Sequence, residues 1–153
     1  MSASSVNTGA NRVVGKGRLS PAKTVTFTFD GKTLNAMEGD TLASALLANG
    51  IHLVGRSFKY HRPRGILGAG PEEPNALMGI SRDKARFQPN VRATCQEVFD
   101  GMDAKSQNRF PSLEFDVGAV NDGLGRFFPA GFYYKTFMWP QSAWDKLYEP
   151  IIR

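Results

Sequence analysis

The sequence predicts a small α+β domain, and two neighbouring segments carry this prediction. Residues 24–37 alternate between apolar and polar side chains on either side of one Asp-Gly pair, a pattern typical of a β-hairpin. Residues 41–50 place leucine and alanine three and four positions apart and end in glycine, which is typical of a short helix. With 153 residues, of which 41% are hydrophobic, the chain is long enough to bury one core.

The first strand of the hairpin places Val25, Phe27 and Phe29 on one face and threonines on the other. Valine, phenylalanine and threonine all have a high propensity for strands, so both faces of the segment support the prediction. Asp30-Gly31 supplies the two-residue turn, because both residues tolerate the positive φ angles that such a turn requires. Residues 32–37 then return as the second strand and keep the alternation.

The predicted helix begins where Asp40 or Thr41 can accept a hydrogen bond from its first backbone amide groups. Gly50 can adopt the left-handed conformation that ends it. A hairpin followed by a helix that packs across it is the opening of a β-grasp fold, which we place at residues 21–100. Another type of α+β sandwich could begin in the same way.

Three further segments complete the predicted organisation. Residues 1–20 are small, polar and glycine-rich, which indicates a flexible leader. Residues 65–79 are rich in glycine and proline and are predicted to be mostly loop, whereas residues 91–98 are predicted to form a short strand. Residues 101–153 are predicted to form a mostly irregular, aromatic-rich extension.

Aromatic residues gather in the last part of this extension, at Phe127, Phe128, Phe132, Tyr133, Tyr134, Phe137, Trp139, Trp144 and Tyr148. A lone small domain rarely exposes so much aromatic surface. The segment therefore either folds back onto the domain or docks on another domain or subunit, and we favour docking.

Composition excludes several classes of function. The net charge is +5, but the cations are scattered apart from one cluster at residues 56–64, which argues against a nucleic-acid partner. The single cysteine, Cys95, excludes an internal disulfide and a cysteine-based zinc or iron–sulfur site. No stretch approaches 18 apolar residues and no signal peptide is visible, so we expect a cytoplasmic protein without a membrane partner.

No catalytic or nucleotide-binding motif emerges from the sequence. The loop at residues 68–73 lacks the third glycine and the following helix of a dinucleotide fingerprint. His61 lies in a basic loop, which is either solvated or in contact with an anionic cofactor or partner. The candidates for contact with a flavin phosphate or an acidic partner are Arg56, Lys59, Arg62 and Arg64.

The glycine-rich loop resembles the cluster-binding loop in the β-grasp [2Fe–2S] domains of several amine and opine dehydrogenases. Three cysteines of that loop (G-L-F-C-G-M-G-V-C-F-D-C) align with Gly68, Glu73 and Ala76. The fourth, in a V-R-A-C stretch, aligns with Thr94, while Cys95 comes one position later and would face the other side of a strand. The resemblance thus implies a ferredoxin-like core in which all four thiolate ligands are replaced.

Longer runs resemble the N-terminal region of the alpha subunits of heterotetrameric sarcosine oxidases. The runs are residues 55–65, 68–76, 106–109, 115–122 and 128–140, and the similarity covers residues 20–153. In that family the holoenzyme oxidises sarcosine to glycine with oxygen and releases hydrogen peroxide, and the methyl carbon leaves as formaldehyde or is passed to tetrahydrofolate. The resemblance implies FAD, FMN, NAD and tetrahydrofolate in the holoenzyme and none of them in this chain.

The resemblance therefore implies a structural or assembly role without catalytic residues. The partners would be the remainder of the alpha subunit, beginning with a nucleotide-binding domain, and the beta, gamma and delta subunits. The interface residues that we expect are Phe128, Phe132, Tyr133, Tyr134, Phe137 and Trp139. The alternative is a stand-alone binding protein for an anionic ligand or nucleic acid.

Overall fold

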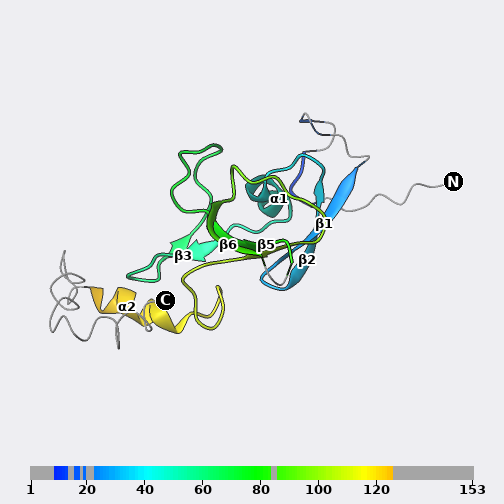
Figure 1. Ribbon diagram of the computed structural model, residues 1–153. Coiled ribbons are helices and arrows are strands. Elements are labelled where there is room, and N and C mark those ends of the chain that lie inside the picture. The colour runs from blue at the N-terminus through cyan, green and yellow to red at the C-terminus, as the bar shows by residue number, and fades with distance from the viewer. Residues whose placement is uncertain (1–8, 14–15, 18, 20–22, 84–85, 126–153) are drawn as a thin grey trace.

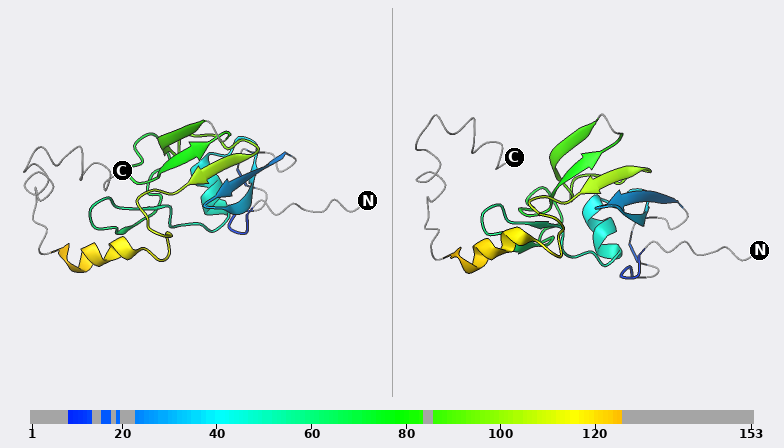
Figure 2. Two further views of the ribbon diagram at one scale, coloured as in Figure 1. Left: turned by 60° about the horizontal axis from the view of Figure 1, so that its bottom comes forward. Right: turned by 90° about the horizontal axis from the view of Figure 1, so that it is seen from below.

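The computed structural model describes residues 9–13, 16–17, 19, 23–83 and 86–125 (Figure 1). These residues form a five-stranded sheet in the order β2-β1-β7-β5-β6, in which only β1 and β7 are parallel neighbours. The strands are β1 (Thr24–Phe29), β2 (Lys32–Met37), β5 (Leu77–Ser81), β6 (Phe87–Arg92) and β7 (Met102–Lys105). Helix α1 (Leu42–Ala48) packs on one side of the sheet (Figure 2). This mixed sheet with its one packed helix confirms the predicted α+β, β-grasp class.

Smaller elements lie beside the sheet. Strands β3 (Gly55–Arg56) and β4 (Pro63–Arg64) pair as a short antiparallel hairpin. The 3-10 helix η1 (Val117–Ala119) leads directly into helix α2 (Val120–Gly123). Figure 1 shows α2 next to the β3–β4 hairpin and away from the main sheet.

The hairpin of β1 and β2 forms as predicted. Phe29 pairs with Lys32 across the turn, and Asp30 and Gly31 have φ angles of 48° and 82°. Two positive φ angles are typical of a type I′ turn, which matches the right-handed twist of the flanking strands. Phe27 and Phe29 are buried, so the apolar face of β1 contributes to the core.

Helix α1 also forms where the sequence predicts it. The Thr41 hydroxyl accepts a hydrogen bond from the Ser44 N–H at 3.2 Å, which identifies Thr41 as the capping residue. Gly50, with a φ of 77°, follows the end of the helix. Leu42 and Leu46 are fully buried against the sheet and anchor the helix to it.

The sheet differs from the expectations in three respects. Strand β5 begins inside the expected loop 65–79 and runs two residues past its end, and its residues Met78 and Ile80 join the core. Strand β7 begins beyond residue 100, yet it lies in the centre of the sheet between β1 and β5. The prediction of a strand at residues 91–98 is wrong, because β6 begins earlier, at Phe87, and ends at Arg92.

Residues 93–98 follow β6 outside the sheet and accept hydrogen bonds from the start of helix α1. The Ala93 carbonyl accepts from the Ala43 N–H at 3.0 Å, and the Gln96 carbonyl accepts from the Leu42 N–H at 2.8 Å. The first amide groups of a helix have no partner within the helix, so these carbonyl groups satisfy two of them.

Part of the expected leader contacts the core. The Asn11 N–H donates to the Ala48 carbonyl at 3.0 Å, and Arg12 forms an ion pair with Asp40 at 2.5 Å. Residues 9–13 therefore extend the packed structure on the side of helix α1. The boundaries of the leader and of the extension stay predictions.

Candidate functional site

The loop that aligns with a cluster-binding loop encloses a carboxylate. The Glu73 side chain is fully buried, and its two oxygens accept four hydrogen bonds from backbone N–H groups. Oε2 accepts from Leu67 at 2.7 Å and from Gly68. Oε1 accepts from Asn75 at 2.8 Å and from Ala76 at 3.3 Å. Both ends of the loop thus point their amide groups at one acidic side chain.

These contacts keep the carboxylate ionised. Burial raises the pKa of Glu73, because a low dielectric disfavours charge, but the backbone hydrogen bonds from Gly68, Asn75, Leu67 and Ala76 lower it more. The net result is a pKa below the usual range for glutamate. At neutral pH the loop therefore holds a buried negative charge.

The other three positions that align with cluster cysteines also lack a ligand. Ala76 is fully buried, and the Thr94 hydroxyl donates to the Gly70 carbonyl at 2.7 Å. Gly68 contributes only its backbone, and a Cβ there would lie 3.4 Å from the Glu73 carboxylate. One carboxylate and one hydroxyl do not match the soft thiolate donors that an iron–sulfur cluster requires.

The remaining cysteine does not reach this loop interior. Cys95 is exposed, whereas its neighbour Thr94 is buried. The Cys95 thiol still lies 3.9 Å from the Thr94 hydroxyl, because the backbone here is a turn and not the strand that the sequence analysis assumed. Within the described ranges, no group of three or more His, Cys, Asp or Glu residues could hold a metal ion.

The predicted basic loop is bound to a later part of the chain. The Arg56 guanidinium donates to the Leu113 carbonyl at 3.0 Å and 2.5 Å and to the His61 carbonyl at 3.0 Å. Its Nε atom lies 3.7 Å from the Asp116 carboxylate, and its side chain is only 9% exposed. Arg56 therefore joins two segments of this chain and does not face solvent.

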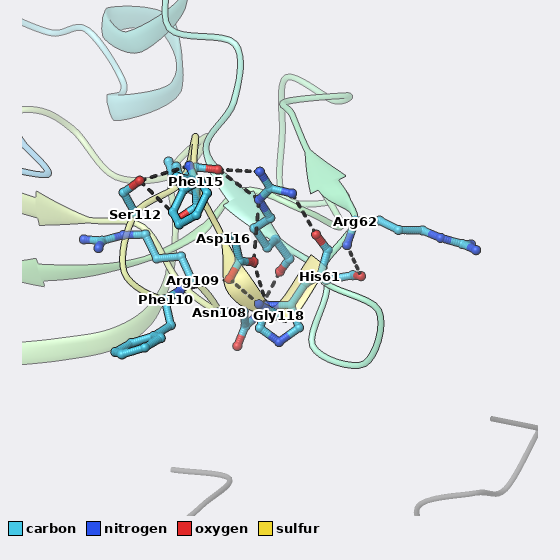
Figure 3. A network of polar contacts seen from close by, with 12 residues as sticks. His61, Arg62, Asn108, Arg109, Phe110, Ser112, Phe115, Asp116 and Gly118 are labelled. Carbon is cyan, nitrogen blue, oxygen red and sulfur yellow. Dashed lines mark hydrogen bonds and ion pairs between the residues drawn. The ribbon is translucent and has the colours of Figure 1, made fainter. Parts of the chain in front are cut away.

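Asp116 forms the centre of this contact (Figure 3). Its buried carboxylate accepts from the N–H groups of Phe110 and Gly118, both at 3.1 Å, and lies 2.7 Å from His61 Nδ1. Burial raises the pKa of Asp116, but the His61 hydrogen bond and the two N–H groups bring it below its usual range. Gly118 makes room for this contact, since a Cβ there would lie 2.4 Å from the His61 ring.

The other predicted cations do not converge on one site. Arg62 forms an exposed ion pair with Asp122 at 2.6 Å. Lys59 and Arg62 lie 5.0 Å and 4.9 Å from the centre of the Tyr60 ring. Arg64 is exposed and lines a groove of about 220 Å³ together with Arg56, Phe58, Asn75 and Gln107.

The sequence analysis missed the residues that organise these contacts. Asp116 is a buried acid, and nothing in its local sequence distinguishes it from an exposed one, whereas Asp40, which is also buried, was named only as a possible helix cap. Glu73 was identified only as a replaced ligand position. The position of Glu73 within the glycine-rich loop could have indicated this role, because such loops direct backbone N–H groups at anions.

The predicted interface residues lie outside the described residues, namely Phe128, Phe132, Tyr133, Tyr134, Phe137 and Trp139. The structure also bears on the membrane prediction. Among the described residues, no helix is both long enough and apolar enough to cross a membrane.

Comparison with known proteins identifies relatives. Residues 22–109 match the family described as "2Fe-2S iron-sulfur cluster binding domain". The chain is 65% identical to the "Sarcosine oxidase subunit alpha" of Rhizobium meliloti (strain 1021) over 129 residues, which is 84% of this chain. It is 45% identical over 92 residues, or 57% of this chain, to the protein of the same name from Corynebacterium sp. (strain U-96).

The matched region is a small part of these relatives, since it spans 13% of the Rhizobium meliloti protein and 9% of the Corynebacterium protein. One solved structure, the L-proline dehydrogenase from P. horikoshii, is 34% identical and has a TM-score of 0.46. The similarity covers 57% of this chain and 16% of that one.

Proposed function

We propose that this chain, which belongs to the 2Fe-2S iron-sulfur cluster binding domain family, is a structural and assembly module of a sarcosine oxidase alpha subunit. The observation that carries the proposal is the buried Glu73 carboxylate, which fills the loop at a position that the resemblance described above aligns with a cysteine ligand. A domain that keeps the loop but has no thiolate donor at the four aligned positions would keep its shape without electron transfer.

The names of the relatives support the larger context. The two sarcosine oxidase relatives are named as alpha subunits, which implies an enzyme of several subunits. We propose that this chain acts within such a complex, in the cytoplasm, together with the remainder of the alpha subunit and with beta, gamma and delta subunits. The complex would oxidise sarcosine to glycine, with FAD, FMN, NAD and tetrahydrofolate bound by its other parts.

The alternative, a stand-alone binding protein for an anionic ligand or nucleic acid, has less support. Such a protein needs cations that are available to a ligand. Arg56 is engaged with backbone carbonyls and Asp116, and Arg62 is paired with Asp122. Among the described residues that line the groove, Arg64 is the exposed cation, and a single exposed cation there does not make a binding surface for a polyanion.

Complementation of a truncated oxidase tests the proposal. A sarcosine oxidase whose alpha subunit lacks the region that matches this chain would be co-expressed with its other subunits, with or without the chain supplied separately. We expect the chain to co-purify with the complex and to restore its assembly and sarcosine-dependent production of hydrogen peroxide. A truncated complex that assembles and turns over equally well without the chain would contradict the proposal.

A further inference from the structure

The loop around Glu73 has the chemistry of an anion site. Four backbone N–H donors converge on it, two from Leu67 and Gly68 and two from Asn75 and Ala76. Consecutive backbone N–H groups that point into one concavity form a nest, and nests bind phosphates and iron–sulfur clusters. A cluster held by four thiolates is itself an anion that accepts hydrogen bonds at its sulfur atoms.

Leu67 is an exposed residue, but the Ala76 N–H is buried and cannot be left without an acceptor. A buried N–H group that lacks a partner costs free energy comparable to that of a lost hydrogen bond. Ala76 is fully buried, so water does not readily replace the carboxylate there. When the cluster ligands are absent, the loop still requires an anion at its centre.

The Glu73 side chain fits this requirement in charge as well as in shape. An ionised carboxylate has acceptor sites only, and each of its oxygens here faces two donors. A glutamine in the same place would turn its NH2 group towards two N–H groups. The geometry therefore selects an anion over a neutral side chain of the same shape.

We infer that residues 67–76 form an anion-binding nest, that Glu73 occupies it as an internal ligand, and that a shortened side chain leaves a site for a small carboxylate. Acetate and formate are the appropriate class of ligand, because they carry the two oxygens that Glu73 supplies. This inference concerns the loop itself and does not depend on the proposed function.

Rescue of a variant by added acetate tests the inference. Glu73→Ala in the full chain removes the internal ligand and leaves room for an external one. Glu72→Ala is the matched control, because the adjacent Glu72 is exposed and its carboxylate, which accepts from the Gly70 N–H at 3.1 Å, lies outside the buried ring of donors. Thermal unfolding would be followed as sodium acetate replaces sodium chloride at constant ionic strength.

We expect the melting temperature of Glu73→Ala to rise saturably with acetate, since a ligand that binds only the folded state stabilises it by mass action. Formate should act in the same way. The original chain and Glu72→Ala should show no saturable rise. A folded Glu73→Ala variant that gains no more from acetate than Glu72→Ala does would overturn the inference.

The unmodified chain provides a second readout, which decides the matter if Glu73→Ala does not fold at any acetate concentration. The amide protons of Leu67, Gly68, Asn75 and Ala76 would be followed by NMR as the pH is lowered. We expect all four to shift together with the carboxyl carbon of Glu73 as it takes up its proton. Amide protons that stay unchanged through that titration would overturn the inference.

Discussion

The Asp116 carboxylate lies 2.7 Å from the Nδ1 atom of His61, and this contact joins parts of the chain that are 55 residues apart in sequence. Because Asp116 is ionised and can only accept, His61 donates from Nδ1. The same carboxylate accepts from two backbone amide groups and lies beside Arg56. One buried acid therefore holds the β3–β4 hairpin against the segment that contains η1.

Asp116→Ala should lower the free energy of unfolding by about 2–3 kcal/mol, because it leaves buried donors and the Arg56 charge without a partner. Asp122→Ala is the control, since it removes an exposed ion pair with Arg62 and should cost less than about 1 kcal/mol. Urea denaturation of both variants measures the difference. Equal, small losses would show that the Asp116 contacts contribute little.

Asp40→Ala should lower the free energy of unfolding by about 2–3 kcal/mol. Its buried carboxylate accepts from the Met37 N–H and the Ser44 hydroxyl, both at 2.9 Å, and pairs with Arg12. Glu38→Ala is the control, because the Glu38 pair with Lys23 is exposed and should contribute less than about 1 kcal/mol. Chemical denaturation compares the two, and a loss of equal size in Glu38→Ala would count against a special role for Asp40.

Acid should destabilise the chain through its buried carboxylates. Burial raises the pKa values of Glu73 and Asp116, but their hydrogen bonds lower both below the usual range. For each group, the folded state thus binds fewer protons than the unfolded state at pH values between the folded-state pKa and the unfolded-state pKa. The stability that these groups provide is complete above about pH 5 and is lost as the pH falls through their folded-state pKa values.

The free energy of unfolding, measured by urea denaturation from about pH 7 to about pH 3, checks this dependence. Glu73→Gln and Asp116→Asn should each reduce the slope of the free energy of unfolding against pH below about pH 5. Glu72→Gln is the exposed counterpart: backbone hydrogen bonds, first its own and then that from Gly70, also lower the pKa of Glu72, so this variant should reduce the slope as well, but less than the two buried ones. Unchanged slopes in the first two variants would mean that other groups cause the acid sensitivity.

The sequence was sufficient for those elements whose signals are local. The alternation from Thr24 to Phe29, the Asp30-Gly31 turn and the Thr41 cap each act within a few residues, and all were confirmed. Strands β5 and β7 depend on neighbours far away in the sequence. Gly79 lies within β5 and β7 has only four residues, so burial in the sheet and not local propensity determines them.

The candidate site could be predicted only in part. Alignment with a cluster loop identified the positions of Gly68, Glu73, Ala76 and Thr94. It could not show that the Glu73 carboxylate turns inward, because this depends on the direction of backbone N–H groups in a folded loop. Arg56 was expected to contact a cofactor or an acidic partner, but it is bound to Leu113 and His61, which the sequence places far from each other.

Phe132→Ala or Trp139→Ala should weaken assembly with other subunits more than the stability of the described core. This prediction comes from the sequence, since both residues lie outside the described residues. Leu46→Ala is the contrasting variant, because Leu46 is fully buried in the core and its truncation should cost about 2–5 kcal/mol. Co-purification measures assembly and chemical denaturation measures core stability. Losses of core stability as large as that of Leu46→Ala would argue against an interface role.

Glu73→Cys should not restore an iron–sulfur cluster. The variant gains one thiolate at an aligned ligand position, but Gly68, Ala76 and Thr94 still provide none. Reconstitution with iron and sulfide under anaerobic conditions, followed by iron analysis, checks this expectation. The original chain treated in parallel is the control, and stoichiometric iron in the single variant would show that the aligned positions are not the ligand set.

A visible absorption spectrum of the purified full chain, with iron and flavin assays, tests the central claim most directly. The claim is that the loop around Glu73 keeps the shape of a cluster-binding domain without its redox chemistry. We predict a colourless protein without iron or flavin, before and after anaerobic treatment with iron and sulfide. Cluster absorption bands with bound iron would contradict this claim, and bound flavin would instead identify a cofactor contact in this chain.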